Sequence, residues 1–181
     1  MTTATAVSTW TIDASHSIAE FAVKHMMVST VKGRFATLEG AAEIDERDAL
    51  LSSVRATLDV ASITTNEAAR DAHLKSDDFF NAEKFPTIAF ASKRIERVDA
   101  ENYRVVGDLT IRDVTKEVVL DTEFEGQVRD PWGNDRAGFT AKAQISRGEF
   151  GVNFNGLLET GGVIVSDKVK ITLHIEVVRN K

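Results

Sequence analysis

The stretch that decides the fold lies near the end of the chain and reads Val169-Lys-Ile-Thr-Leu-His-Ile-Glu-Val177. Every second residue is Val, Ile or Leu, and the residues between them are polar or charged. Successive side chains of a β-strand point to opposite faces, so this period of two predicts a strand with one dry face and one wet face. A fold built from such strands has water on one side of its sheet only.

The same alternation recurs upstream along most of the chain. The predicted strands are residues 17–25, 35–44, 51–60, 87–95, 103–111, 118–129, 137–146 and 163–178. Turn signals such as Asp130-Pro-Trp-Gly-Asn134 separate several of them, and no strand–helix–strand alternation or fixed-period repeat is present. The sequence therefore predicts one all-β, mainly antiparallel domain over residues 9–181, preceded by a flexible tail of residues 1–8.

Eight long antiparallel strands can close into an up-and-down barrel or split into a sandwich. A packed interior needs large side chains on the dry faces, because protein cores reach crystal-like density. Several dry-face positions are small instead: Gly40, Ala42, Ala56, Gly107, Gly126, Ala137, Ala141 and Ala143. These residues favour an eight-stranded, lipocalin-like barrel with an open lumen. The alternative is a filled barrel, in which side chains such as Phe21 and Phe139 reach across the interior.

One stretch breaks the alternation and favours a short helix. Residues 63–75 place Ala and Leu at helical spacing, with Asn66 or Thr65 as the expected N-cap. Phe79 and Phe80 follow in a short turn. A connection of this length has to cross one end of the barrel, so we expect it to cover a mouth of the lumen.

Composition excludes several classes of protein. The 181 residues carry 28 acidic and 22 basic side chains, and a net charge of −6 is the wrong sign for binding nucleic acid. With no Cys, the chain has no disulfide and no Cys-based metal site or nucleophile. No stretch approaches the roughly 18 apolar residues of a membrane span. The first residues lack a secretory signal, which predicts a cytoplasmic protein, or an exported one if a signal has been cleaved.

Two groups of polar residues are candidate sites. Asp13-Ala-Ser-His16 brings a carboxylate, a hydroxyl and an imidazole together, but such a segment between strands is ordinarily a turn. The other His residues are far apart in sequence, so no metal site is expected. Polar side chains at the lumen or its mouths are candidates for holding the polar head of a ligand. They are His25, Arg70, His73 and Arg147.

Several stretches, in order along nearly the whole chain, resemble motifs of the YceI-like family. One is Gly107-Asp-Leu-Thr-Ile-Arg-Asp-Val-Thr-Lys116, where Asp113 stands in place of the family's usual Gly. The other matching stretches are residues 13–35, 62–66, 70–80, 85–92, 130–133, 138–139, 146–152 and 165–169. The resemblance implies a lipocalin-like antiparallel barrel that binds a long isoprenoid or similar amphiphilic chain, and a homodimer is common among such proteins.

The function that follows is a non-enzymatic carrier or store for a lipid such as a polyprenyl quinone or its precursor, with no other cofactor. Tail burial supplies the affinity, and a few polar groups select the head. The rivals are an enzyme that uses His25 as acid or base on an amphiphile, and a filled barrel that serves as an interaction module. The expected lumen residues are Phe21, Val23, Phe35, Leu38, Ala42, Phe79, Phe80, Phe90, Gly107, Leu109, Phe139 and Ala141.

Overall fold

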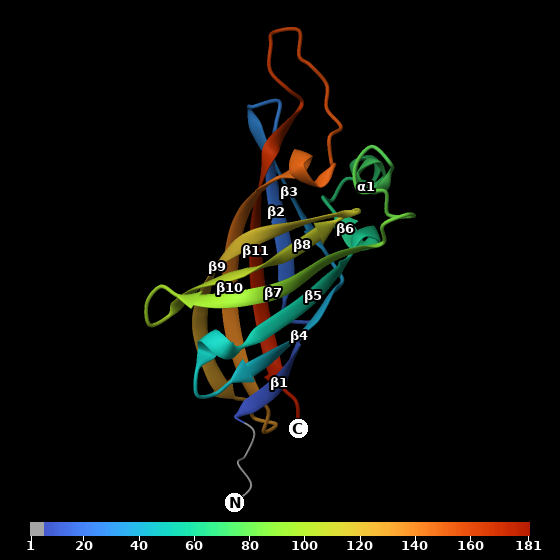
Figure 1. Cartoon of the computed structure of the whole chain (residues 1–181). Helices are drawn as coiled ribbons and strands as arrows, with labels where there is room; N and C mark the ends of the chain where they lie inside the picture. Colours follow the sequence, from blue (N-terminus) through green and yellow to red (C-terminus); the bar gives the residue numbers. More distant parts are fainter. Residues whose placement is uncertain (1–5) are drawn as a thin grey trace, which may run out of the picture.

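The computed structural model describes residues 6–181, and its strands wrap into a closed barrel (Figure 1). The strands are β1 (Val7–Ile12), β2 (Ile18–His25), β3 (Ser29–Phe35), β4 (Leu38–Asp45), β5 (Ser53–Asp59), β6 (Ile63–Thr64), β7 (Thr87–Arg97), β8 (Asn102–Ile111), β9 (Val114–Arg129), β10 (Asp135–Ser146) and β11 (Val165–Arg179). The helical elements are η1 (Ala49–Leu51), η2 (Val60–Ser62), α1 (Ala68–Lys75) and η3 (Arg147–Phe150). None of these helices is long and apolar enough to cross a membrane.

The eleven strand segments form eight barrel strands. β1 and β2 both pair with β11, β1 near the end of β11 and β2 along its first part, so they are two halves of one interrupted strand. In the same way β3 continues into β4, and β5 continues into β6. Each barrel strand is antiparallel to its neighbours, and Trp10 of β1 pairs with Arg179 of β11 to close the ring. The predicted eight-stranded up-and-down barrel is confirmed.

The start of the barrel corrects the predicted tail. Val7 and Ser8, which we expected in a flexible segment, lie in β1 and pair with Asp45 and Ile44. Ser8 also accepts a hydrogen bond of 2.8 Å from the indole of Trp10, which helps to bury this ring. Ala6 accepts a hydrogen bond of 2.8 Å from the backbone N–H of Glu46, and residues 1–5 of the predicted tail lie outside the described residues.

Sequence reasoning also missed β3. Its core-facing positions include Gly33, and its outer positions carry Thr30, Lys32 and Arg34, so the alternation of large apolar residues is weak. It pairs along its length with β2. A side chain at residue 33 would clash with the ring of Phe21, so Gly33 lets that ring pack against the strand.

The predicted helix forms over Ala68–Lys75, but its cap differs from the expectation. The carboxylate of Glu67 accepts hydrogen bonds from the backbone N–H groups of Ala69 and Arg70. Thr65 instead donates its hydroxyl to Asp71, 2.6 Å away. An acidic side chain at the cap also suits the positive end of the helix dipole.

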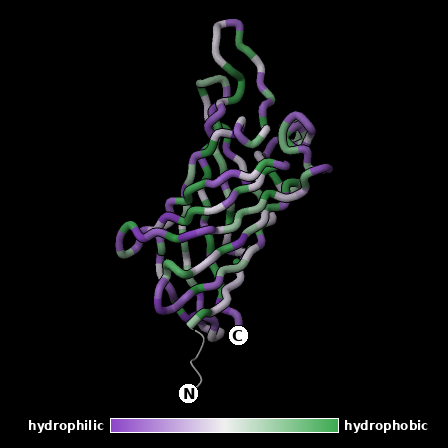
Figure 2. The backbone as a smooth tube through the Cα atoms, viewed as in Figure 1, coloured by the Kyte–Doolittle hydropathy of each residue, from purple (hydrophilic) through white to green (hydrophobic). Residues whose placement is uncertain are grey.

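Figure 1 shows α1 and the loop of residues 151–164 at one end of the barrel, and the C-terminus at the other. Along the strands, hydrophobic and hydrophilic residues alternate as the sequence predicts (Figure 2). The larger of two buried clusters lies beside α1 and consists of Phe35, Val60, Ile63, Phe79, Ile88, Ile111, Ile145, Phe150 and Val152. We call this the lidded end of the barrel.

Candidate functional site

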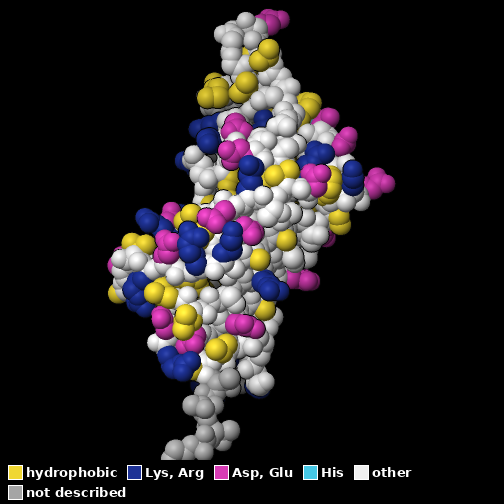
Figure 3. All heavy atoms as spheres, viewed as in Figure 1, with side chains coloured by type: hydrophobic (Ala, Val, Ile, Leu, Met, Phe, Trp, Pro, Cys, Tyr) yellow, Lys and Arg dark blue, Asp and Glu magenta, His cyan; other side chains and the backbone are white. Residues whose placement is uncertain are grey.

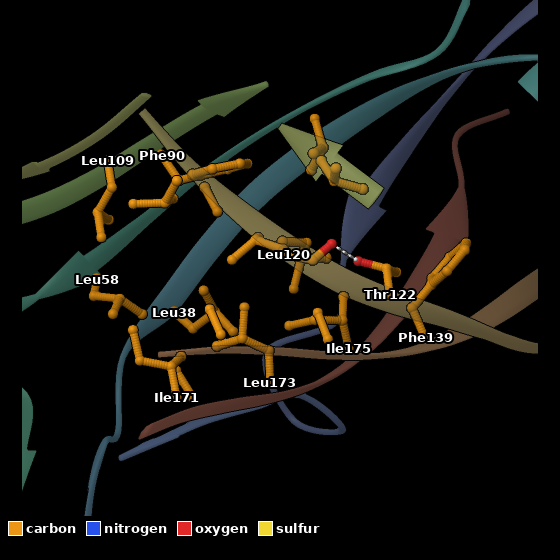
Figure 4. Close-up of a pocket in the computed structure, with 18 of the residues that line it drawn as sticks. Leu38, Leu58, Phe90, Leu109, Leu120, Thr122, Phe139, Ile171, Leu173 and Ile175 are labelled. Atoms are coloured by element: carbon orange, nitrogen blue, oxygen red, sulfur yellow. Dashed lines mark hydrogen bonds between the residues drawn. The ribbon is translucent and has the colours of Figure 1, made fainter. Parts of the chain in front are cut away.

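The barrel encloses a cavity of about 790 Å³. This volume lies in the upper part of the roughly 300–1,000 Å³ range of pockets that bury small ligands. Side chains from opposite walls, among them Leu38, Phe90 and Leu173, point toward one another across it (Figure 4). The hydroxyl of Thr122 donates to the carbonyl of Leu120, 3.1 Å away in its own strand. The wall of the cavity between its two ends is therefore apolar. The hydroxyl of Thr122 is already engaged by its own strand.

Eleven of the twelve expected lumen residues line the cavity: Phe21, Val23, Phe35, Leu38, Ala42, Phe79, Phe80, Phe90, Leu109, Phe139 and Ala141. The exception is Gly107. A Cβ built at Gly107 would clash with the carbonyl oxygen of Ala91 and the ring of Phe90, so Phe90 covers this position. The prediction that Gly107 lines the lumen is wrong because the ring of Phe90 occupies the space that a side chain at residue 107 would take.

Small residues do widen the lumen elsewhere. Ala42, Ala56, Ala137, Ala141 and Ala143 all line the cavity. Ala42 keeps part of its surface exposed although it points inward, which means that it faces open space. Of the two alternatives, the interior is therefore an open lumen and not one filled by side chains.

The lidded end is closed by two segments that contact each other. Phe79 follows α1 and is buried, and its ring centroid lies 5.2 Å from that of Phe154 in the loop of residues 151–164. The ring of His73 on α1 lies 5.0 Å from Phe79 and 4.8 Å from Phe154, edge-on to both. The helix and the loop therefore meet over the same end of the barrel.

Three of the four expected headgroup contacts lie outside the cavity lining. His25 is the last residue of β2 and pairs with Ser29, beyond the lumen. Arg70 donates from Nε to the hydroxyl of Thr65 at 2.7 Å. His73 pairs with Asp78.

Arg147 does line the cavity, but its guanidinium is used by the backbone. It donates to the carbonyls of Val152 (2.7 Å), Phe154 (2.9 Å), Ser166 (2.9 Å) and Val165 (3.2 Å). Burial lowers the pKa of this side chain, as expected for a cation held in the protein interior. Arg147 thus fixes the start of the loop of residues 151–164 against β11.

The polar groups that sequence reasoning missed gather at the end opposite the lid. Arg47, Arg97, Tyr103, Gln127 and Arg179 line the cavity there, from the connection after β4, the β7–β8 hairpin, β9 and β11. We call this end the polar mouth. The guanidinium of Arg97 lies 5.3 Å from the ring centre of Tyr103. One sequence feature indicates a polar group in the lumen: Tyr103, the single Tyr of the chain, stands on the dry face of a predicted strand.

The Asp13 cluster is a structural junction between β1 and β2. Asp13 and the hydroxyl of Ser15 both approach Nδ1 of His16, at 3.0 and 3.1 Å, so the ring cannot pass a proton from one to the other through its two nitrogens. The ligand atoms of Asp13, His16 and Glu176 lie within 4.8 Å of one another, close enough to share a cation. Arg136 already fills that role, because its guanidinium donates to both carboxylates.

The Arg136 junction predicts a pH-dependent stability. Hydrogen bonds from Ser15, His16 and Arg136 hold the pKa of Asp13 well below its usual range. Burial raises the pKa of Asp130, but the hydrogen bonds that it accepts, from Arg136 first, outweigh this and lower it. A carboxyl with a lowered folded-state pKa stabilises the fold above its unfolded pKa, near 4, and this contribution is lost as the pH falls toward the folded-state value.

We therefore expect Arg136→Gln to lower the midpoint of thermal unfolding at neutral pH, with a difference from wild type that shrinks below about pH 4. Thermal melts followed by circular dichroism across this range measure it. Arg55→Gln is the control, since Arg55 is exposed and forms no ion pair with any described residue. An Arg136→Gln difference that stays constant down to the lowest pH would contradict the assignment.

Comparison with known proteins agrees with this barrel. The model of the YceI-like domain matches residues 10–177. The chain belongs to the YceI-like family. A UPF0312 protein of Staphylococcus aureus (strain USA300) is 40% identical over 171 residues, which cover 94% of this chain and 97% of the relative.

Solved structures similar to this YceI-like barrel include the following two. The Campylobacter jejuni YceI protein is 31% identical, with a TM-score of 0.75 over 87% of this chain and 90% of that one. A polyisoprenoid binding domain from Saccharophagus degradans shares the fold at 12% identity, with a TM-score of 0.69 over 94% of this chain and 98% of that one.

The departure from the YceI-like motif at Asp113 lies in the turn between β8 and β9. Ile111 pairs directly with Val114, so the turn has two residues. The positive φ of this turn falls on Arg112, at 56°, and not on Asp113. An Asp is therefore accommodated without the backbone freedom of Gly.

Proposed function

We propose that this protein binds and carries a long-chain isoprenoid or similar amphiphilic lipid, such as a polyprenyl quinone or its precursor. The observation that carries the proposal is the apolar lumen of about 790 Å³ inside the barrel. The polyisoprenoid binding domain of Saccharophagus degradans, which has the same fold, supports this ligand class.

The lumen suggests how affinity and selectivity are divided. Each buried methylene contributes about 0.8 kcal/mol, so a twenty-carbon tail offers a gross term near ~16 kcal/mol before the cost of ordering the chain and of association. The polar groups are concentrated at the polar mouth, where Arg97 and Tyr103 offer a cation and a hydroxyl. In our proposal the head lies at this mouth and the tail extends toward Phe79 and Phe80.

The two rival functions have less support. The cavity lining contains no His among the described residues, so the proposed acid or base His25 does not reach a substrate in the lumen. An interaction module without a ligand would not need an open apolar lumen. A cytoplasmic location and a homodimer stay predictions.

Organic extraction of the purified protein followed by mass spectrometry tests the proposal. We expect a prenyl lipid in stoichiometric amount, and we expect added polyprenyl quinones to bind more tightly as the tail lengthens, because each isoprene unit buries further methylenes. A short-tailed quinone with the same head is the control. An extract without lipid, together with equal affinity for short and long tails, would refute a lipid carrier.

A further inference from the structure

Two segments project from the lidded end of the barrel, and both carry exposed apolar side chains. The β2–β3 turn exposes 40% of Met26, 61% of Met27 and 80% of Val28. The neighbouring loop of residues 151–164 exposes 36% of Phe154 and 86% of Leu157. The two segments lie side by side, since the N–H of Met26 donates to the carbonyl of Ile164 at 2.8 Å. We call these five residues the apolar tip, and yellow side chains mark the two projections in Figure 3.

The fold does not require methionine in this turn. Met26 and Met27 both have positive φ, at 48° and 60°, a conformation for which Asn and Gly are preferred and which strains other residues. The side chains of Met26 and Met27 are thus exposed to water although their backbone conformation is energetically unfavourable. Strain of this kind is retained where the side chains have a task.

Free cations lie directly behind the apolar tip. Lys24 and Lys32 point outward from the two strands of the hairpin, because their neighbours Val23 and Val31 take the opposite face. Lys168 and Lys170 point outward from the adjoining strand β11. All four side chains are exposed, and none forms an ion pair with another residue that the structure describes. In Figure 3 dark blue groups lie below the yellow ones at this end.

Acidic side chains also lie at this end, among them the exposed Glu149 of η3, and Figure 3 shows magenta groups beside the dark blue ones. Asp167 accepts hydrogen bonds from the hydroxyl of Ser146 and the N–H of Gly148, and Glu159 lies in the loop itself. The chain as a whole carries a net charge of −6, so the four unpaired lysines are a local feature. A convex apolar projection backed by unpaired cations matches the interface of a bilayer, in which anionic headgroups overlie hydrocarbon.

We propose that the apolar tip docks this protein onto an anionic lipid surface. Met27, Val28 and Leu157 enter the interface, and the lysines behind them contact the lipid phosphates. The lidded end, with Phe79 and Phe154 over the lumen, then faces the bilayer. The purpose of docking rests on the proposed lipid-carrier function, but docking itself depends only on surface residues.

Flotation with phosphatidylcholine vesicles, with and without added phosphatidylglycerol, tests this proposal. We expect the wild type to float with the anionic vesicles only. Met27→Ser with Val28→Ser is expected to weaken binding at least tenfold, and Lys24→Gln with Lys168→Gln by about fivefold per lysine. The matched control, Trp132→Ser with Arg129→Gln, removes one exposed apolar side chain and one exposed cation at the opposite end and should float as the wild type does.

Three results would overturn the proposal: no flotation of the wild type with anionic vesicles, unchanged flotation of the Met27→Ser, Val28→Ser variant, or a tip-dependent dimer detected by light scattering without vesicles. Circular dichroism shows that each variant is folded. A variant with a blocked lumen should still float, so failure of lipid binding in the lumen and failure of docking give different results.

Discussion

Replacing Ala42 by Trp is expected to weaken the binding of a prenyl lipid about a hundredfold while the barrel keeps its fold. Ala42 points into the lumen from β4, beside the buried cluster that contains Trp10 and Leu38, and it retains exposed surface there, so an indole can extend from it into the open space of the lumen. The ring takes the room of about four methylenes of the ligand, a loss of about 3 kcal/mol of buried tail. Titration with a long-tailed quinone measures the change.

The matched control is Ala41→Trp. Ala41 is the preceding residue of the same strand, is exposed, and points to the outside of the barrel. It should leave affinity for the lipid unchanged and show that a Trp in β4 is tolerated by the sheet. If Ala42→Trp binds the long-tailed quinone as the wild type does, the lumen is not the binding site.

Replacing Arg147 by Met is expected to lower the free energy of unfolding by about 3 kcal/mol. The substitution keeps the length of the side chain but removes a guanidinium that donates to four backbone carbonyls, and it costs the buried carbonyl of Val152 this partner. For a chain of this size the midpoint of thermal unfolding should fall by about 6–12 °C. Exchange of a bound lipid should also become faster, because the loop that carries Phe154 loses its anchor.

Arg70→Met provides the comparison for Arg147→Met. Arg70 also donates hydrogen bonds to a residue nearby in the chain, but it is exposed, so its loss should cost less than about 1 kcal/mol. Equal unfolding temperatures for wild type and Arg147→Met would show that other contacts hold the loop. Slower lipid exchange in this variant would contradict the role of the loop as a cover.

The alternation of residues predicts most of the fold because a barrel wall has one dry and one wet face. It succeeds along β11, where Val, Ile and Leu occupy every inward position of residues 169–177. It fails at β3, where Gly33 stands at an inward position and Phe21 of the neighbouring strand packs over it. Packing across strands, which a local pattern does not contain, decides such positions.

The sequence predicts the residues that form the wall of the lumen, but not the residues at its two ends. Alternation places a side chain inside or outside the sheet, which identified Leu38 and Phe139 as lumen residues. It does not show where along a strand the lumen stops, so His25 was expected inside and lies beyond it. The polar mouth combines Arg97, Tyr103 and Gln127 from three strands, and only the closed barrel brings them together.

The pairing of β1 with β11 has a consequence for how the protein is made. Trp10 of β1 finds its partner Arg179 only when β11 has left the ribosome. Until then the nascent sheet has two unpaired edges and an uncovered apolar face, features that favour aggregation. Contacts this distant in sequence also slow folding. Closure of the barrel therefore has to await the synthesis of β11.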